Sequence, residues 1–222
     1  MASGEMANLS SGGEEVDTSL AESYALATQN LRSTVRWILA AAAAVGGALV
    51  AGLQLTNLGA LPLEQWPRLL TAVVGAAIAL AAIGSMVYQA SRILTDDWIT
   101  LAQLSLHEFQ SKLSRSAHLE GLFEELEVYK AELYGQVADS LPGLYDALRK
   151  VNVEERHQTS RSQALNQDAA TVRGAVAAVV QFANYFSTRR KFAALSRGLG
   201  VSTAVAFIGV LLFAYAANPP AV

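Results

Sequence analysis

The chain has 222 residues, of which 52% are hydrophobic and only 16% are charged. Because soluble domains carry roughly 25% charged residues, this composition argues against a soluble protein. The formal net charge of -3 is too small to indicate a nucleic-acid partner. The absence of cysteine excludes disulfides, thiolate metal sites and a cysteine nucleophile.

The N-terminal region changes in character before the first apolar block. Residues 1–18 are rich in Ser, Gly and Glu, and we expect them to form a disordered tail. Over residues 19–34 apolar side chains recur three or four positions apart, which predicts a juxtamembrane helix.

Three apolar blocks almost free of charge follow, at residues 35–55, 69–88 and 199–217. Each has about 20 residues, which as a helix spans the roughly 30 Å of a hydrocarbon core. Buried helices of a soluble protein are the alternative, but three uniformly apolar blocks in so short a chain argue against it. We therefore predict an all-α membrane protein with a two-span hairpin within 35–90, a third transmembrane helix within 197–217 and a tail at 218–222.

Basic residues flank these blocks unevenly. The first block is preceded by Arg32 and Arg36, and the second is followed by Arg92. The third is preceded by the cluster Arg189, Arg190, Lys191 and Arg197. The 56–68 loop contains only Arg68, and the C-terminal tail has no charge. Since basic residues are retained in the cytoplasm, we expect a cytoplasmic N-terminus, a cytoplasmic 91–196 region and an outer C-terminus.

Small residues form rows on the first two apolar segments: Ala40, Ala44, Ala48 and Gly52 on the first, and Ala72, Gly75, Ala76 and Ala79 on the second. Such rows let helix backbones approach closely in lipid. The contact lies either between helices of one chain or between chains.

The 91–196 region is predicted to be helical, with two apolar stripes. One stripe lies within a helix over 117–140 that stops at Pro142-Gly143. The other is a heptad-like seam formed by Val172, Val176, Val179, Ala183 and Phe186. The stripes pair either as an antiparallel hairpin within the chain or by self-association.

Catalytic motifs are absent from the sequence, so we expect no enzyme activity, no cofactor and no metal site. The basic residues around a polar turn are instead candidates for an anion pocket, because arginine binds phosphate well. These residues are Arg149, Arg156, Arg161 and Arg173. Ordinary solvated charge is the alternative for them, and topogenic charge is the alternative for Arg189, Arg190, Lys191 and Arg197.

The order of elements resembles that of the transmembrane effectors of bacterial anti-phage signalling, above all the Pycsar type and also the SLATT type. The residues that carry the resemblance are Asn30-Leu-Arg-Ser-Thr-Val-Arg-Trp37 before the first span and Tyr185-Phe-Ser-Thr-Arg-Arg-Lys-Phe-Ala-Ala-Leu195 before the third. The resemblance implies a plasma-membrane protein of antiviral defence that a cyclic pyrimidine mononucleotide triggers to impair the membrane.

From these features we expect a homo-oligomeric membrane effector whose partners are the lipid bilayer and a cyclic nucleotide, with no nucleic acid. The alternative is a non-enzymatic anchor that recruits a partner through its cytoplasmic helices.

Overall fold

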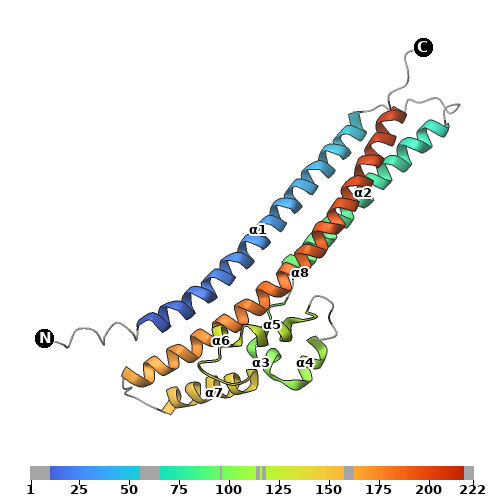
Figure 1. The fold of residues 1–222 in the computed structure, drawn as a ribbon. Helices are drawn as coiled ribbons and strands as arrows, with labels where there is room; N and C mark the ends of the chain where they lie inside the picture. The colour runs from blue at the N-terminus through green and yellow to red at the C-terminus, as the bar shows by residue number, and fades with distance from the viewer. Residues whose placement is uncertain are drawn as a thin grey trace. The chain divides into compact units, whose positions relative to one another are not determined.

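Helices make up almost all of the described chain. The computed structural model describes residues 11–55, 66–95, 97–113, 116, 119–157 and 163–217. These residues form helices and, within the described ranges, no strand, which confirms the predicted all-α class. The helices are α1 Ser11–Leu55, α2 Trp66–Leu94, α3 Leu101–Ser105, α4 His107–Leu113, α5 Leu122–Val128, α6 Lys130–Leu133, α7 Leu141–His157 and α8 Gln163–Ala217 (Figure 1).

The chain divides into two compact units that share its longest helices. Unit 1 comprises Met1–Leu31 and Asp97–Arg190, and unit 2 comprises Arg32–Asp96 and Lys191–Val222. α1 and α8 each begin in unit 1 and end in unit 2. Neither helix contains proline, the residue that most often breaks a helix, so the predicted juxtamembrane helix and first span form one continuous helix.

α1 begins earlier than the sequence predicts. A disordered tail was expected over residues 1–18, but the helix already starts at Ser11, and residues 1–10 lie outside the described part. Adding a residue to an existing helix fixes one residue for one hydrogen bond, whereas nucleation is costly. A long helix therefore extends beyond the amphipathic pattern that predicts its start.

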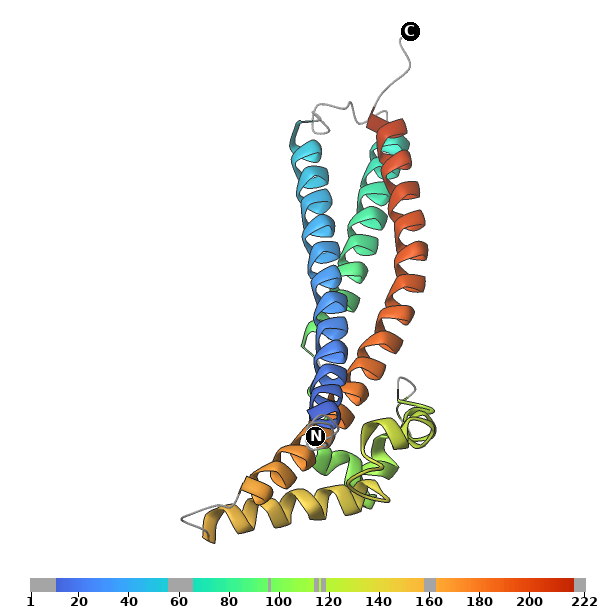
Figure 2. The same ribbon diagram turned by 60° about the vertical axis from the view of Figure 1, so that its left-hand side comes forward.

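In unit 2 the C-terminal parts of α1 and α8 run alongside α2 (Figures 1 and 2). α2 and α8 meet where both lack a side chain. A Cβ atom added to Gly75 would lie 2.8 Å from the carbonyl oxygen of Gly209, and one added to Gly209 would lie 2.6 Å from the carbonyl oxygen of Gly75. The small-residue row of the second span, which includes the buried Ala72, Ala76 and Ala79, therefore packs within the chain.

The small-residue row of the first span behaves differently. Ala40, Ala44 and Ala48 are exposed in the single chain. α1 instead approaches α2 at Gly46, where an added Cβ atom would lie 3.4 Å from Ile83. The contact within the chain thus uses another face of α1.

Three helices are long and apolar enough to cross a membrane, within Ser19–Gly52, Trp66–Leu94 and Leu165–Ala216. The chain itself buries only 11%, 33% and 17% of their apolar windows. Large side chains such as Trp37, Phe207 and Tyr215 point outward, an arrangement that suits lipid and that water penalises. The protein is a multi-pass membrane protein.

The last of these helices is much longer than a bilayer is thick. Its 55 residues extend for about 80 Å at 1.5 Å per residue, against roughly 30 Å of hydrocarbon. A bilayer therefore accommodates only part of this helix.

Unit 1 is held together by one apolar core. Leu104, Leu122, Leu126 and Leu144 are fully buried there together with Val179. Both predicted stripes contribute, the first through Leu119, Leu122, Leu126 and Leu133, the second through Val179, Ala183 and Phe186. Both stripes therefore lie in one core of the same chain.

The single helix predicted over 117–140 is wrong. Gly121 has a φ of 79°, the left-handed conformation that glycine adopts without strain, and α5 begins only after it. α5 ends at Val128, because the ψ of 11° at the following residue, Tyr129, is not helical, and α6 follows as a separate turn. The region between the second and third spans is thus a set of short helices, α3 to α7, packed on α8.

The predicted stop at Pro142-Gly143 coincides with the start of α7. Ser140 is the capping residue, since its Oγ accepts a hydrogen bond of 3.2 Å from the Gly143 backbone N–H. Proline is tolerated in a first helical turn because an N–H there has no partner within the helix.

An amide side chain anchors the extended segment between α2 and α3. The Ile99 N–H donates to Asn184 Oδ1 at 2.9 Å, and Asn184 Nδ2 donates to the Ile99 carbonyl oxygen at 2.9 Å. A further bond of 2.7 Å runs from Asn184 Nδ2 to the Val180 carbonyl oxygen. The amide thereby satisfies the backbone N–H and carbonyl oxygen of Ile99, a residue outside any helix.

Candidate ligand-binding site

The four arginines predicted to bind an anion do not share one pocket among the described residues. Arg149 and Arg156 are exposed on α7. Arg173 on α8 donates from its guanidinium to the Glu155 carboxylate on α7. Arg161 lies outside the described residues. The Arg173–Glu155 pair links α7 to α8 and occupies a donor that an anion would need.

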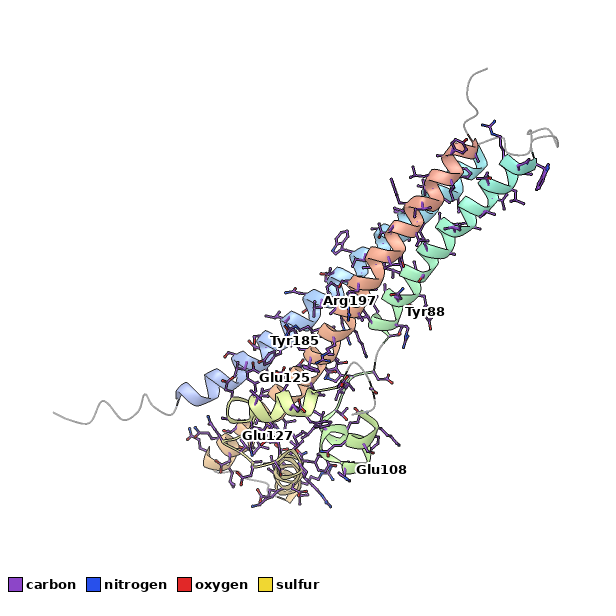
Figure 3. The ribbon with its side chains drawn as sticks, turned by 45° about the vertical axis from the view of Figure 1, so that its right-hand side comes forward. Tyr88, Glu108, Glu125, Glu127, Tyr185 and Arg197 are labelled. Carbon is purple, nitrogen blue, oxygen red and sulfur yellow. The ribbon has the colours of Figure 1, made fainter. Side chains whose placement is uncertain are left out.

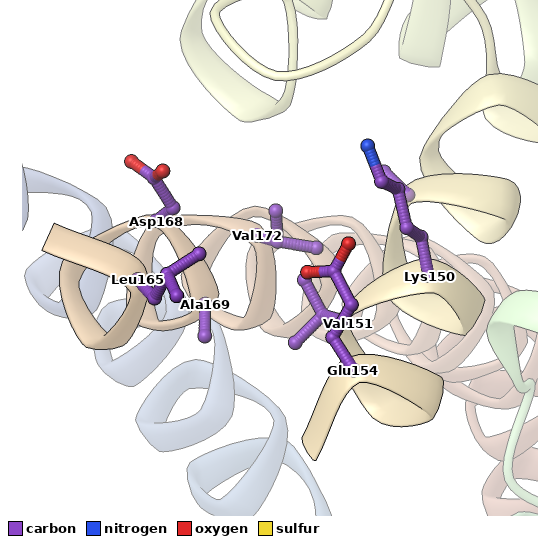
Figure 4. A pocket seen from close by; sticks show the side chains of 8 residues that line it. Lys150, Val151, Glu154, Leu165, Asp168, Ala169 and Val172 are labelled. Atoms are coloured by element: carbon purple, nitrogen blue, oxygen red, sulfur yellow. The ribbon is translucent and has the colours of Figure 1, made fainter. Parts of the chain in front are cut away.

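A pocket of about 280 Å³ lies between α7 and α8 (Figure 4). This volume is slightly below the roughly 300 Å³ at which the range of ligand sites begins. Its charged side chains are those of Lys150 and Glu154 on α7 and Asp168 on α8. One cation and two carboxylates make a lining that repels anions. The pocket is therefore a poor fit for a nucleotide phosphate.

The predicted juxtamembrane cluster divides into residues with different surroundings. Arg189 is exposed, and the Arg190 guanidinium stacks over the Phe186 ring at 5.0 Å. Arg197 is also exposed (Figure 3). Its Nε donates to the Ala193 carbonyl oxygen of its own helix at 3.3 Å. Each of these three side chains therefore has surroundings of its own.

Lys191 is the exception in this cluster. It is half-buried in unit 2, and the positive charges of Arg92 on α2 and Arg32 on α1 both act on its ammonium group. Three helices thus bring one cation each to the same end of unit 2.

In the sequence, the positions of Arg32 and Arg92 indicate only the orientation of the spans and do not predict that both charges act on Lys191. The available signal was one basic residue just beyond each apolar block. Arg92 also lies in the last turn of α2, where the helix dipole favours a cation.

The acidic residues of α4 and α5 face solvent. The side chains of Glu108 on α4 and of Glu125 and Glu127 on α5 are exposed (Figure 3). Glu127 also pairs with Lys130 at 3.5 Å. In the part of the chain that the structure describes, no three His, Asp or Glu side chains group closely enough to hold a metal ion.

Tyr134 is a buried titratable residue in the apolar core of unit 1. Burial, and after it the charge of Glu127, raises the pKa of its phenol. The phenol is therefore neutral at physiological pH and serves as a core side chain.

Comparison of the chain with protein families, curated proteins and solved structures finds no match. The class of the protein thus follows from its structure: a helical multi-pass membrane protein with three apolar helices, two of which begin in a separate helical unit.

Proposed function

We propose that the protein is a membrane effector of bacterial anti-phage signalling, in which a cyclic nucleotide triggers membrane impairment and growth arrest. The observation that supports this most is the continuity of α1 and α8, which leave unit 1 and become membrane-spanning helices without a break. A change of packing in unit 1 acts directly on two of the three spans. The excess of basic residues at this end of the spans favours a cytoplasmic unit 1 and N-terminus, with the C-terminus outside.

Gating requires two packing states of the same helices. The ligand must bind the active state more tightly than the resting state, because equal affinity would shift nothing. The exposed row Ala40, Ala44 and Ala48 on α1 offers a surface for close contact with another chain. In the proposed active state this row packs in a homo-oligomer that breaches the bilayer.

A direct test is expression in bacteria with a pyrimidine cyclase, with membrane potential followed by a dye. We expect depolarisation and growth arrest only with the active cyclase. A cyclase with a disabled active site is the control. Unchanged membrane potential in both strains would contradict the effector function.

The arginines around the polar turn remain the proposed contacts for this trigger. Removing a bidentate arginine from an anion site weakens binding by about 10- to 150-fold. Nucleotide titration of the detergent-solubilised protein should show this loss for Arg149→Ala or Arg156→Ala. The exposed Arg36 gives a control variant, Arg36→Ala, with the same change of charge.

An anchor that recruits a partner is the second candidate. It is favoured by exposed apolar side chains on unit 1, notably Val128, Leu106 and Phe109, of which Val128 is 76% exposed. If the protein is an anchor, we expect it to retain a cytoplasmic protein at the membrane and to lose this retention in Val128→Asp. We also expect no change of membrane potential when the cyclase is present.

A further inference from the structure

The pocket of about 280 Å³ between α7 and α8 lies within unit 1 and has no part in the proposed function. Its lining residues on α7 lie three or four positions apart, from Ala147 to Glu154, and so form one face of that helix. Arg149 and Arg156, the proposed nucleotide contacts on α7, are not among them. The pocket is therefore a second candidate site in unit 1.

Apolar side chains from both helices form most of the pocket wall. They are those of Ala147, Val151, Leu165, Ala169 and Val172. Val151, Leu165 and Val172 are only half-buried, so part of their apolar surface remains in contact with water. A ligand with an apolar body would remove this surface from water, and this removal favours binding.

Each helix also brings one carboxylate to the pocket. Glu154 of α7 is half-buried and Asp168 of α8 is exposed. Figure 4 shows their carboxyl groups at different ends of the pocket, with Val172 between them. Among the residues that the structure describes, no ion pair or hydrogen bond occupies either carboxylate. Both carboxylates are therefore available to a cationic ligand.

A linear aliphatic diamine has the features that this lining complements. Its methylene chain is apolar, and its two ends are ammonium groups, which form strong hydrogen bonds with carboxylates. A metal ion fits less well, because the pocket offers only two acidic ligands. We propose that the pocket binds a short aliphatic diamine, with one ammonium group at Glu154, the other at Asp168 and the methylene chain against the apolar wall. Lys150, the third charged lining residue, opposes this ligand by its like charge.

The test is equilibrium dialysis of the full-length protein against radiolabelled butane-1,4-diamine. The protein is kept in dodecyl maltoside, an uncharged detergent, and the ionic strength is held constant. Unlabelled butane-1,4-diol and butanedioate serve as competitors, because they have the same carbon chain with no charge or with negative charge. The site variants are Glu154→Gln, Asp168→Asn and Lys150→Gln. Glu125→Gln and Asp139→Asn are matched controls, since both residues are exposed elsewhere in unit 1.

We expect saturable binding of the diamine with a Kd of about 1 mM or below. Glu154→Gln and Asp168→Asn should each weaken it about 3- to 10-fold, a loss limited by the screening of charges near water. Lys150→Gln should instead strengthen binding about two- to fivefold, because it removes a like charge. The controls should change binding by less than about twofold, and neither competitor should displace the diamine.

Absence of saturable binding in the millimolar range would overturn the proposal. An equal loss in the controls, displacement by the diol or weaker binding by Lys150→Gln would overturn it as well. Because Asp168 is exposed, Asp168→Asn should fold normally, and it decides the outcome if Glu154→Gln is misfolded. The inference does not depend on the proposed function, because the assay contains no nucleotide and measures no growth.

Discussion

A single amide organises the entry of the chain into unit 1. Asn184 is only 4% exposed and bonds to both backbone groups of Ile99. Residues 97–100 are not helical, so their backbone groups depend on such a side chain. Thr100 then caps the N-terminus of α3 through a capping box with Gln103. The sequence contains the Thr-x-x-Gln pattern, but nothing local in it links Asn184 to a residue 85 positions away.

Replacement of Asn184 by alanine should destabilise unit 1. The change leaves the N–H and the carbonyl oxygen of Ile99 buried without their partner, which costs about 2–4 kcal/mol. The free energy of unfolding can be followed through Trp98 fluorescence in urea, in a background where Trp37 and Trp66 are phenylalanine. The exposed Asn166 on the same helix provides the control Asn166→Ala, which should change the free energy of unfolding by less than about 0.5 kcal/mol. Equal stability of the two variants would show that the Asn184 bonds are dispensable.

At the scale of helices, the apolar segments were predictable because runs of about 20 apolar residues are a local property of a sequence. The break at Tyr129 was not, because the stripe of buried leucines keeps its helical spacing across it. The sequence also does not predict which helix packs on each small-residue row, because the two rows look alike in the sequence. In the structure only the row of α2 is buried.

The contact between α2 and α8 should depend on its two glycines. In Gly75→Ala or Gly209→Ala the new methyl group meets backbone atoms of the other helix, which cannot retreat as a side-chain end could. We expect a loss of about 1–3 kcal/mol in the free energy of unfolding. Unfolding by dodecyl sulfate, followed by helical circular dichroism, measures this loss.

The same two helices supply matched controls for this experiment. A Cβ atom added to Gly84 of α2 or Gly200 of α8 would meet nothing within 4 Å. In the helix interior alanine is favoured over glycine by about 1 kcal/mol, so Gly84→Ala and Gly200→Ala should be neutral or stabilising. A comparable loss in all four variants would show that the close contact between α2 and α8 does not determine the effect.

At the scale of the whole molecule, two helices belong to both units, so neither unit is independent of the membrane. α8 supplies Val179 and Phe186 to the core of unit 1 and Leu195 and Gly209 to the packing of unit 2. This sharing follows from a sequence without proline across both boundaries. It also means that the side of the membrane on which unit 1 lies is set by all three spans together.

Three spans place the two ends of the chain on opposite sides of the membrane. The asymmetry of basic residues predicts a cytoplasmic N-terminus and unit 1, because the flanks at Arg32, Arg92 and Lys191 are cationic while the 56–68 loop contains only Arg68. Alkaline phosphatase is active only outside the cytoplasm, and green fluorescent protein exported by the general secretory route does not fluoresce. Fusion of each reporter after Ala60 and after Val222 should give phosphatase activity without fluorescence, and fusion after Asn152 should give the reverse. Fluorescence after both Asn152 and Val222 would contradict the three-span topology, because the chain would then not cross the membrane between these two positions.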